Sequence, residues 1–212
     1  MDTNASNVIV EGLISYLGLL ILLTFHEFGH AWTALKCGDD TARLQGRVSL
    51  NPVVHIDPIG TVLLPLLMIF LSPNISRFMI GWAKPVPVNP YNLRNPRLDD
   101  ILVSLAGPAM NLVLAVALMA LGRAGIIANA EQFVGLCVRF ASISLLLCFF
   151  NLIPIPPLDG SRILFMLLPS RYDNITATLN QYGPFILLAV VLLAGPLISS
   201  VTFTLTRFLL GY

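Results

Sequence analysis

Long stretches of the chain carry almost no formal charge, and this feature restricts the folds that it can adopt. Five stretches contain no Asp, Glu, Lys or Arg apart from Glu27: Gly12–Leu35, Pro58–Ser76, Ile101–Gly122, Phe140–Leu158 and Asn174–Thr206. A bilayer core about 30 Å thick is crossed by ~20 apolar residues in a helix. Only 11% of all residues are charged, whereas soluble domains carry about 25%. The chain is therefore predicted to be an all-α polytopic membrane protein rather than a solvated fold.

The chain is expected to form a single membrane-embedded domain over residues 1–212. Its expected elements are a first helix at 8–35, a re-entrant region at 58–90, core helices at 101–122 and 133–158, and one C-terminal helix or a helix pair at 174–210. The apolar core of the re-entrant region, Ile59–Leu71, would span about 20 Å as a helix, too short for a crossing. The prolines of Gly81–Pro90 exclude a helix in that segment. The expected architecture is a three-helix catalytic core with this insertion and one or two further C-terminal helices.

The strongest chemical signal is the motif H-E-F-G-H at His26–His30, an H-E-x-x-H pattern. Two histidines four residues apart on a helix lie ~40° apart on one face, so both imidazoles can reach one zinc ion. Glu27 lies beside the metal, where a carboxylate can take a proton from zinc-activated water. The chain has only three histidines, so chance is a poor explanation for this pattern. We expect His26 and His30 to bind zinc and Glu27 to be catalytic.

A catalytic zinc requires three protein ligands and one open position. Glu11 and Glu131 lie at the start of crossing segments, far from the histidines along the membrane normal. The residues that remain as candidates for the third ligand are Asp159, Asp57 and His55.

Three ordered motifs resemble those of the site-2 protease family of intramembrane zinc metalloproteases. They are H-E-F-G-H at His26–His30, A-G-P-A-M-N at Ala106–Asn111 and N-L-I-P-I-P-P-L-D-G at Asn151–Gly160. The resemblance implies that Asp159 is the third zinc ligand, that Glu27 is the general base and that Asn151 helps to hold the substrate. It further implies a small form of the family without a PDZ or CBS domain.

Asn111 and Asn151 are polar residues within apolar helices. Both are candidate substrate-binding residues. The alternative is hydrogen bonding between membrane helices, which we favour for Asn111 and weigh equally for Asn151.

The orientation in the membrane follows from the basic residues. Nine of them fall on one side of the predicted core helices: Lys36, Arg43, Arg47, Arg77, Lys84, Arg94, Arg97, Arg162 and Arg171. The positive-inside rule places this side in the cytoplasm. We expect a multi-pass protein of the cell membrane whose active site lies nearer the cytoplasmic face.

These inferences predict an intramembrane zinc metalloprotease with one Zn²⁺ per chain. It would hydrolyse peptide bonds within or next to transmembrane segments of substrate proteins, so its expected partners are such a substrate and the lipid bilayer. The net charge of +1 indicates no nucleic-acid partner, and the sequence gives no oligomeric state. The alternatives are a zinc or cation transporter, which would place ligands along a path across the bilayer, and a non-catalytic zinc-binding subunit, which would not need Glu27.

Overall fold

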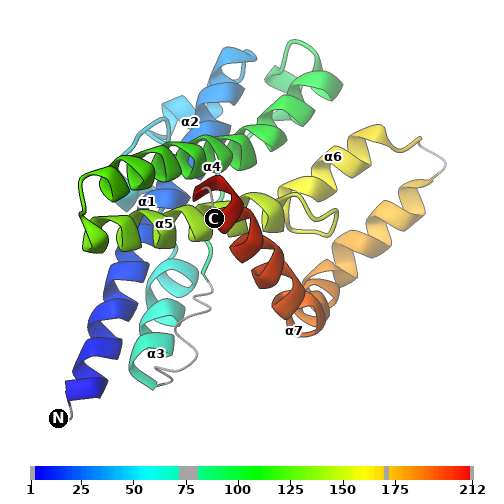
Figure 1. Ribbon diagram of the computed structural model, residues 1–212. Coiled ribbons are helices and arrows are strands. Elements are labelled where there is room, and N and C mark those ends of the chain that lie inside the picture. The colour runs from blue at the N-terminus through cyan, green and yellow to red at the C-terminus, as the bar shows by residue number, and fades with distance from the viewer. Residues whose placement is uncertain (1–2, 72–80, 170–171, 211–212) are drawn as a thin grey trace.

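Every regular element among the described residues is helical, as Figure 1 shows for the computed structural model. The structure describes residues 3–71, 81–169 and 172–210. In chain order the elements are α1 (Thr3–Lys36), α2 (Thr41–Leu44), η1 (Pro52–His55), η2 (Pro58–Leu63), α3 (Leu64–Leu71), η4 (Pro90–Asn92), α4 (Pro96–Ile127), α5 (Glu131–Asn151), α6 (Asp159–Leu167) and α7 (Asp173–Leu210). The all-helical prediction is confirmed.

Three of these helices are long and apolar enough to cross a membrane. The candidate spans are Asn7–Lys36, Pro96–Ile127 and Glu131–Asn151, which correspond to α1, α4 and α5. The helical segment Pro58–Leu71 is apolar but shorter. The chain is therefore an integral membrane protein with a core of three long helices.

Helix α4 packs against both α1 and α5, so it holds the bundle together. Ala115 and Met119 of α4 form a buried cluster with Ala141 and Leu145 of α5. On the other side of α4, a Cβ atom at Gly29 of α1 would lie only 2.8 Å from the Ala106 carbonyl oxygen. Small residues permit this close approach of backbones, as is common between membrane helices.

Helix α5 ends earlier than the expected core helix at 133–158. Its last residue is Asn151, and the next helix, α6, begins at Asp159. Prolines at 154, 156 and 157 lie between the two helices. They remove backbone donors and clash with a continuing helix, so residues 152–158 form a loop and Asp159 becomes the first residue of a new helix.

In the insertion between α1 and α4, the later part of the chain forms hydrogen bonds with the earlier part. The Trp82 N–H donates to the Gly60 carbonyl (3.2 Å), and the Lys84 N–H donates to the His55 carbonyl (2.9 Å). The Thr61 hydroxyl also donates to the Trp82 carbonyl (2.7 Å). Residues 72–80 of the expected re-entrant region lie outside the described residues. Figure 1 shows α3 beside the N-terminal part of α1.

The C-terminal segment is one helix, α7, and not a pair of helices. Figure 1 shows that α7 changes direction between its orange and red parts. The segment contains prolines at 184 and 196, and each proline leaves the helix without one backbone donor. α7 contacts α5 and α4.

Candidate metal centre

His26 and His30 lie one turn apart on α1, and both side chains are buried against α4. Their Nε2 atoms are 3.1 Å apart. The two rings meet edge to face, with centroids 4.7 Å apart. The spacing of the motif therefore brings both Nε2 atoms to one point, as the helix period requires.

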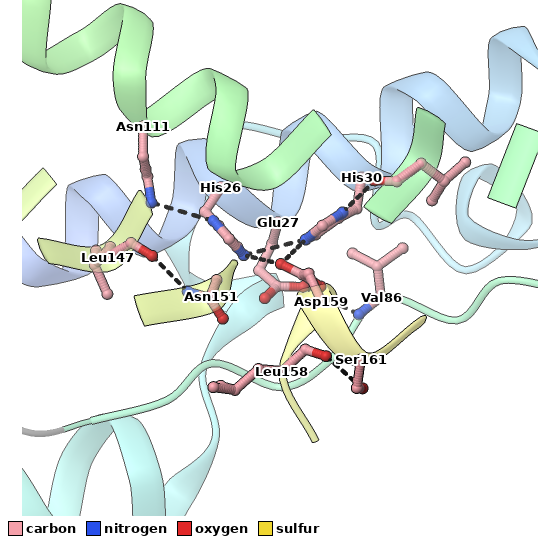
Figure 2. A network of polar contacts seen from close by, with 11 residues as sticks. His26, Glu27, His30, Val86, Asn111, Leu147, Asn151, Leu158, Asp159 and Ser161 are labelled. Atoms are coloured by element: carbon pink, nitrogen blue, oxygen red, sulfur yellow. Dashed lines mark hydrogen bonds and ion pairs between the residues drawn. The ribbon is translucent and has the colours of Figure 1, made fainter. Parts of the chain in front are cut away.

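Asp159 completes a cluster of three ligand atoms (Figure 2). Its Oδ2 atom is 3.2 Å from His26 Nε2 and 3.3 Å from His30 Nε2. Because Asp159 is the first residue of α6, its position depends on the break after α5 and on the docking of α6 onto α4. Among the described residues, this is the one group of at least three His, Cys, Asp or Glu side chains whose ligand atoms converge.

The geometry of the cluster fits a zinc ion. In a tetrahedral site with bonds of about 2.0–2.1 Å, neighbouring ligand atoms are about 3.3 Å apart. The three observed separations are 3.1, 3.2 and 3.3 Å. Two imidazole nitrogens and one carboxylate are also ligand types that zinc prefers. These separations and ligand types are therefore compatible with one zinc ion that all three residues would hold.

The surroundings of Asp159 favour its ionised form. Burial alone raises the pKa of this carboxyl group, but the nearby His30 and the contacts with both imidazoles outweigh that effect. The pKa of Asp159 therefore lies well below its usual range. An aspartic acid has to be ionised before it can bind a metal ion, so this electrostatic balance suits the site.

Helix α4 contacts the Nδ1 atom of each of the two histidines. His30 Nδ1 is 2.7 Å from the backbone carbonyl oxygen of Val103. His26 Nδ1 is 3.1 Å from Nδ2 of Asn111, whose side chain has no exposed surface. The Nδ1 atoms thus face α4 while the Nε2 atoms face Asp159.

Gly107 of α4 makes room for the two imidazoles. A Cβ atom at this position would lie 2.3 Å from His30 Nε2 and 2.6 Å from His26 Cε1. These distances are shorter than any real contact of a Cβ atom, so a larger residue would displace the rings.

Glu27 lies beside the cluster and is also buried. Its Oε2 atom accepts a hydrogen bond from the backbone N–H of Val86 (3.1 Å), as Figure 2 shows. Val86 belongs to the non-helical segment 81–89 of the insertion. Arg47 fastens that segment by donating to the carbonyl oxygens of Lys84 (2.5 Å) and Pro85 (3.3 Å). The carboxylate is therefore fixed next to the three ligand atoms.

Sequence comparisons agree with this geometry. Peptidase family M50 matches residues 14–132 and 123–194. The candidate zinc metalloprotease YwhC of Bacillus subtilis is 39% identical over 84% of this chain and 79% of its own length. The candidate zinc metalloprotease Rip2 of Mycolicibacterium smegmatis is 36% identical over 86% of this chain and 70% of its own length. The chain belongs to peptidase family M50.

This membership confirms the predicted resemblance to the site-2 proteases and makes the chain a member of a zinc metalloprotease family. No solved structure matches this M50 chain.

Two residues that the sequence left open as metal ligands lie outside the cluster of the M50 chain. His55 Nε2 bonds to the Ser49 carbonyl oxygen (2.8 Å), and burial lowers the pKa of this imidazole. Asp57 Oδ1 accepts hydrogen bonds from the backbone N–H groups of Ile59 (3.0 Å) and Gly60 (2.7 Å). Both side chains stabilise the insertion, so Asp159 is the acid that joins the two histidines.

The two asparagines occupy different positions around the centre. Asn151, the last residue of α5, is partly exposed, and its Nδ2 donates to the Leu147 carbonyl oxygen (2.9 Å). Asn111 is fully buried in contact with His26. Figure 2 shows Asn151 below the cluster and Asn111 above it.

Sequence patterns do not reveal two of the contacts at this site. Arg47 reads only as a basic residue of one membrane face, and Val86 acts through its backbone, which no side-chain motif reveals. Gly107 lies within the A-G-P-A-M-N motif, which was a usable signal, because glycine between two apolar helices often marks a close approach.

Proposed function

We propose that the chain is an intramembrane zinc metalloprotease that hydrolyses peptide bonds within or next to transmembrane segments of other proteins. The observation that carries the proposal is the convergence of His26, His30 and Asp159, with Glu27 held beside them. Membership of peptidase family M50 supports it.

His26, His30 and Asp159 would hold one zinc ion per chain. Zinc at such a site lowers the pKa of a bound water molecule towards neutrality and polarises the scissile carbonyl group. The 3.1–3.3 Å separations of the ligand atoms support this ligand set.

Glu27 is the proposed general base. Its carboxylate would accept the proton of the attacking water and pass it to the leaving amine. The Val86 N–H bonds to Oε2 and so holds the carboxylate in one orientation without blocking Oε1 as an acceptor.

The proposed substrate is a transmembrane segment that unwinds locally before cleavage. A helix in lipid hides its peptide groups in internal hydrogen bonds, so an intact helix cannot present a scissile bond. Asn151, at the end of α5 and partly exposed, is the proposed contact with the unwound backbone. The excess of basic residues supports an active site nearer the cytoplasmic face.

The rival functions require other arrangements. A transporter needs ligands distributed along a path across the bilayer, whereas the described ligand atoms form a single cluster. A non-catalytic zinc-binding subunit has no need of a buried, oriented Glu27. The proteolytic function accounts for both features.

The decisive test is Glu27→Gln, assayed with a defined transmembrane substrate reconstituted in lipid. The amide retains the shape of the side chain but cannot accept a proton. We expect unchanged zinc content and a fall in the rate of cleavage by about 10²–10⁴-fold, the usual contribution of a general base. Leu13→Ala, at a lipid-facing position of the same helix, is the matched control. Cleavage by Glu27→Gln at the wild-type rate would refute the proposed role.

Asp159→Asn tests the ligand set. A neutral amide oxygen is a poorer zinc ligand than a carboxylate, so we expect zinc affinity to fall by more than about 100-fold, beyond the effect of losing an outer contact. Competition with a chromogenic chelator measures this change in the detergent-solubilised protein. An unaltered affinity would move the third ligand to another residue.

A further inference from the structure

A histidine that binds a metal through Nε2 must carry its proton on Nδ1. A neutral imidazole has one N–H group and one lone pair. The Nε2 atoms of His26 and His30 face Asp159 Oδ2, so a metal ion held by these three residues would need the lone pair of each Nε2 atom. Each Nδ1–H group then needs an acceptor, which in metal sites is usually a carbonyl or a carboxylate.

The partner of His30 settles its tautomer. The Val103 carbonyl oxygen, 2.7 Å from Nδ1, can only accept a hydrogen bond. A neutral His30 therefore carries its proton on Nδ1 and presents a lone pair on Nε2.

The partner of His26 is ambiguous. Asn111 places Nδ2 at 3.1 Å from His26 Nδ1. An N–H donor at this point would push the proton of a neutral His26 onto Nε2, where it would face the other ligand atoms. However, the oxygen and nitrogen of an asparagine amide exchange places by a half-turn of the side chain, and their assignment rests on the hydrogen bonds that they make.

The Asn111 side chain is enclosed by the protein. It has no exposed surface, and its Oδ1 is buried without a hydrogen-bond partner among the described residues. The Ser144 hydroxyl of α5 donates to the Asn111 backbone carbonyl oxygen (2.7 Å). This bond ties the backbone at Asn111 to α5 and leaves the side-chain amide free to turn towards His26 with either atom.

We propose that Asn111 is a positioning residue that presents Oδ1 to His26 Nδ1–H and thereby holds His26 in the tautomer that binds metal. The inference rests on the proposed zinc function. It assigns Asn111 to the metal centre through His26 and not to the substrate. Val103 and Asn111, both on α4, would then perform the same task for the two histidines of α1.

The test compares zinc affinities of the full-length chain in detergent, by chelator competition. In Asn111→Asp the carboxylate accepts but cannot donate, so we expect wild-type or tighter binding. In Asn111→Ala the acceptor is lost, and we expect binding to weaken about 10- to 100-fold. Ser144→Ala, which removes a neighbouring buried hydrogen bond, is the matched control and should bind zinc like the wild type.

Three outcomes overturn the proposal: equal affinity in Asn111→Ala and the wild type, weakened binding in Asn111→Asp equal to that of Asn111→Ala, or a comparable loss in Ser144→Ala. A substrate-binding role would instead leave zinc affinity unchanged and raise KM. If the wild type itself bound no zinc, the proposed function would fail first.

A second measurement needs no variant, so it tests the proposal even if the Asn111 variants do not fold. The ¹⁵N chemical shifts of the His26 ring in metal-free wild-type protein report its tautomer directly. We expect a protonated Nδ1, because only an Nδ1–H group can donate to Asn111 Oδ1, and an unprotonated Nδ1 would refute the role of Asn111 whether or not the protein binds zinc.

Discussion

At the scale of single residues, the candidate metal centre depends on the absence of a side chain at Gly107 as well as on the side chains that converge there. Gly107 lies against both imidazoles, where a methyl group would come within 2.6 Å of either ring. The histidines therefore keep their positions only because α4 has no Cβ at that point. The sequence motifs point to the candidate ligands, but the constraint at Gly107 is visible only when α1 and α4 are packed together.

Gly107→Ala is therefore expected to displace His26 and His30 and to reduce zinc affinity by more than about 10-fold, since misplacing an outer contact alone has an effect of that size. Gly135→Ala on α5 is the matched control, because a Cβ atom there meets nothing within 4 Å. Zinc affinity, measured by chelator competition, should be unchanged in the control. Equal affinities for the two variants would contradict this account of Gly107.

At the scale of elements, the short helix α6 decides whether the third ligand reaches the site. Arg162 of α6 forms an ion pair with Asp100 of α4, and Asp100 is only 2% exposed. Arg97 of α4 also donates to the Met166 carbonyl oxygen of α6 (2.6 Å). These contacts hold the whole helix, including Asp159 at its first position, against α4.

Removal of Arg162 leaves the buried Asp100 carboxylate without its partner. We expect Arg162→Ala to lower the free energy of unfolding by about 1–3 kcal/mol, less than for a fully buried pair because the arginine is partly exposed. Zinc affinity should also fall, because this ion pair helps to hold α6, and with it Asp159, against α4. In Asp100→Asn/Arg162→Ala no uncompensated charge remains, so stability should partly return while zinc affinity stays low.

Thermal unfolding in detergent, with and without zinc, measures both effects. Arg43→Ala is the control, since its ion pair with Asp40 lies on the surface and both side chains are exposed. Its expected cost is at most about 0.5 kcal/mol. Additive effects of the Asp100 and Arg162 substitutions would show that the two residues do not stabilise one another.

The helix boundaries show why sequence patterns reach only part of this arrangement. Apolar composition predicted the three long helices, because a membrane span is a local property of a stretch of sequence. Three prolines account for the break after α5, but the expected core helix extended to residue 158 and did not place the start of α6 at Asp159. The pairing of Asp100 with Arg162 joins distant positions, and nothing in the pattern around either residue indicates the other.

At the scale of the whole molecule, the described core is a bundle of α1, α4 and α5 with the cluster at one end of α1. His26 and His30 lie in the last third of that helix, close to Lys36. The insertion and α6 flank the same end. The H-E-x-x-H motif points to two candidate ligands because their spacing is local, whereas the selection of Asp159 over Asp57 required the resemblance and then the geometry.

The proposed orientation predicts the accessibility of single cysteines. We expect Arg43→Cys, in the basic connector after α1, to face the cytoplasm and Ala128→Cys, between α4 and α5, to face the opposite side. Both positions are exposed. In right-side-out vesicles of a variant whose three native cysteines are replaced, a membrane-impermeant thiol reagent should label position 128 alone. Labelling of position 43 but not 128 would reverse the orientation.

The location of Asp159 on a separate helix after α5 has a consequence for synthesis of the protein. The ribosome completes α1, with both histidines, long before it reaches α6. During most of translation the growing chain holds two of the three proposed ligands and no means of completing the set. Catalytic competence would then arise only after α5 has entered the membrane and the following loop has emerged. A chain that terminates early would be inert, and under the proposed function the order of synthesis would protect neighbouring membrane proteins from premature cleavage.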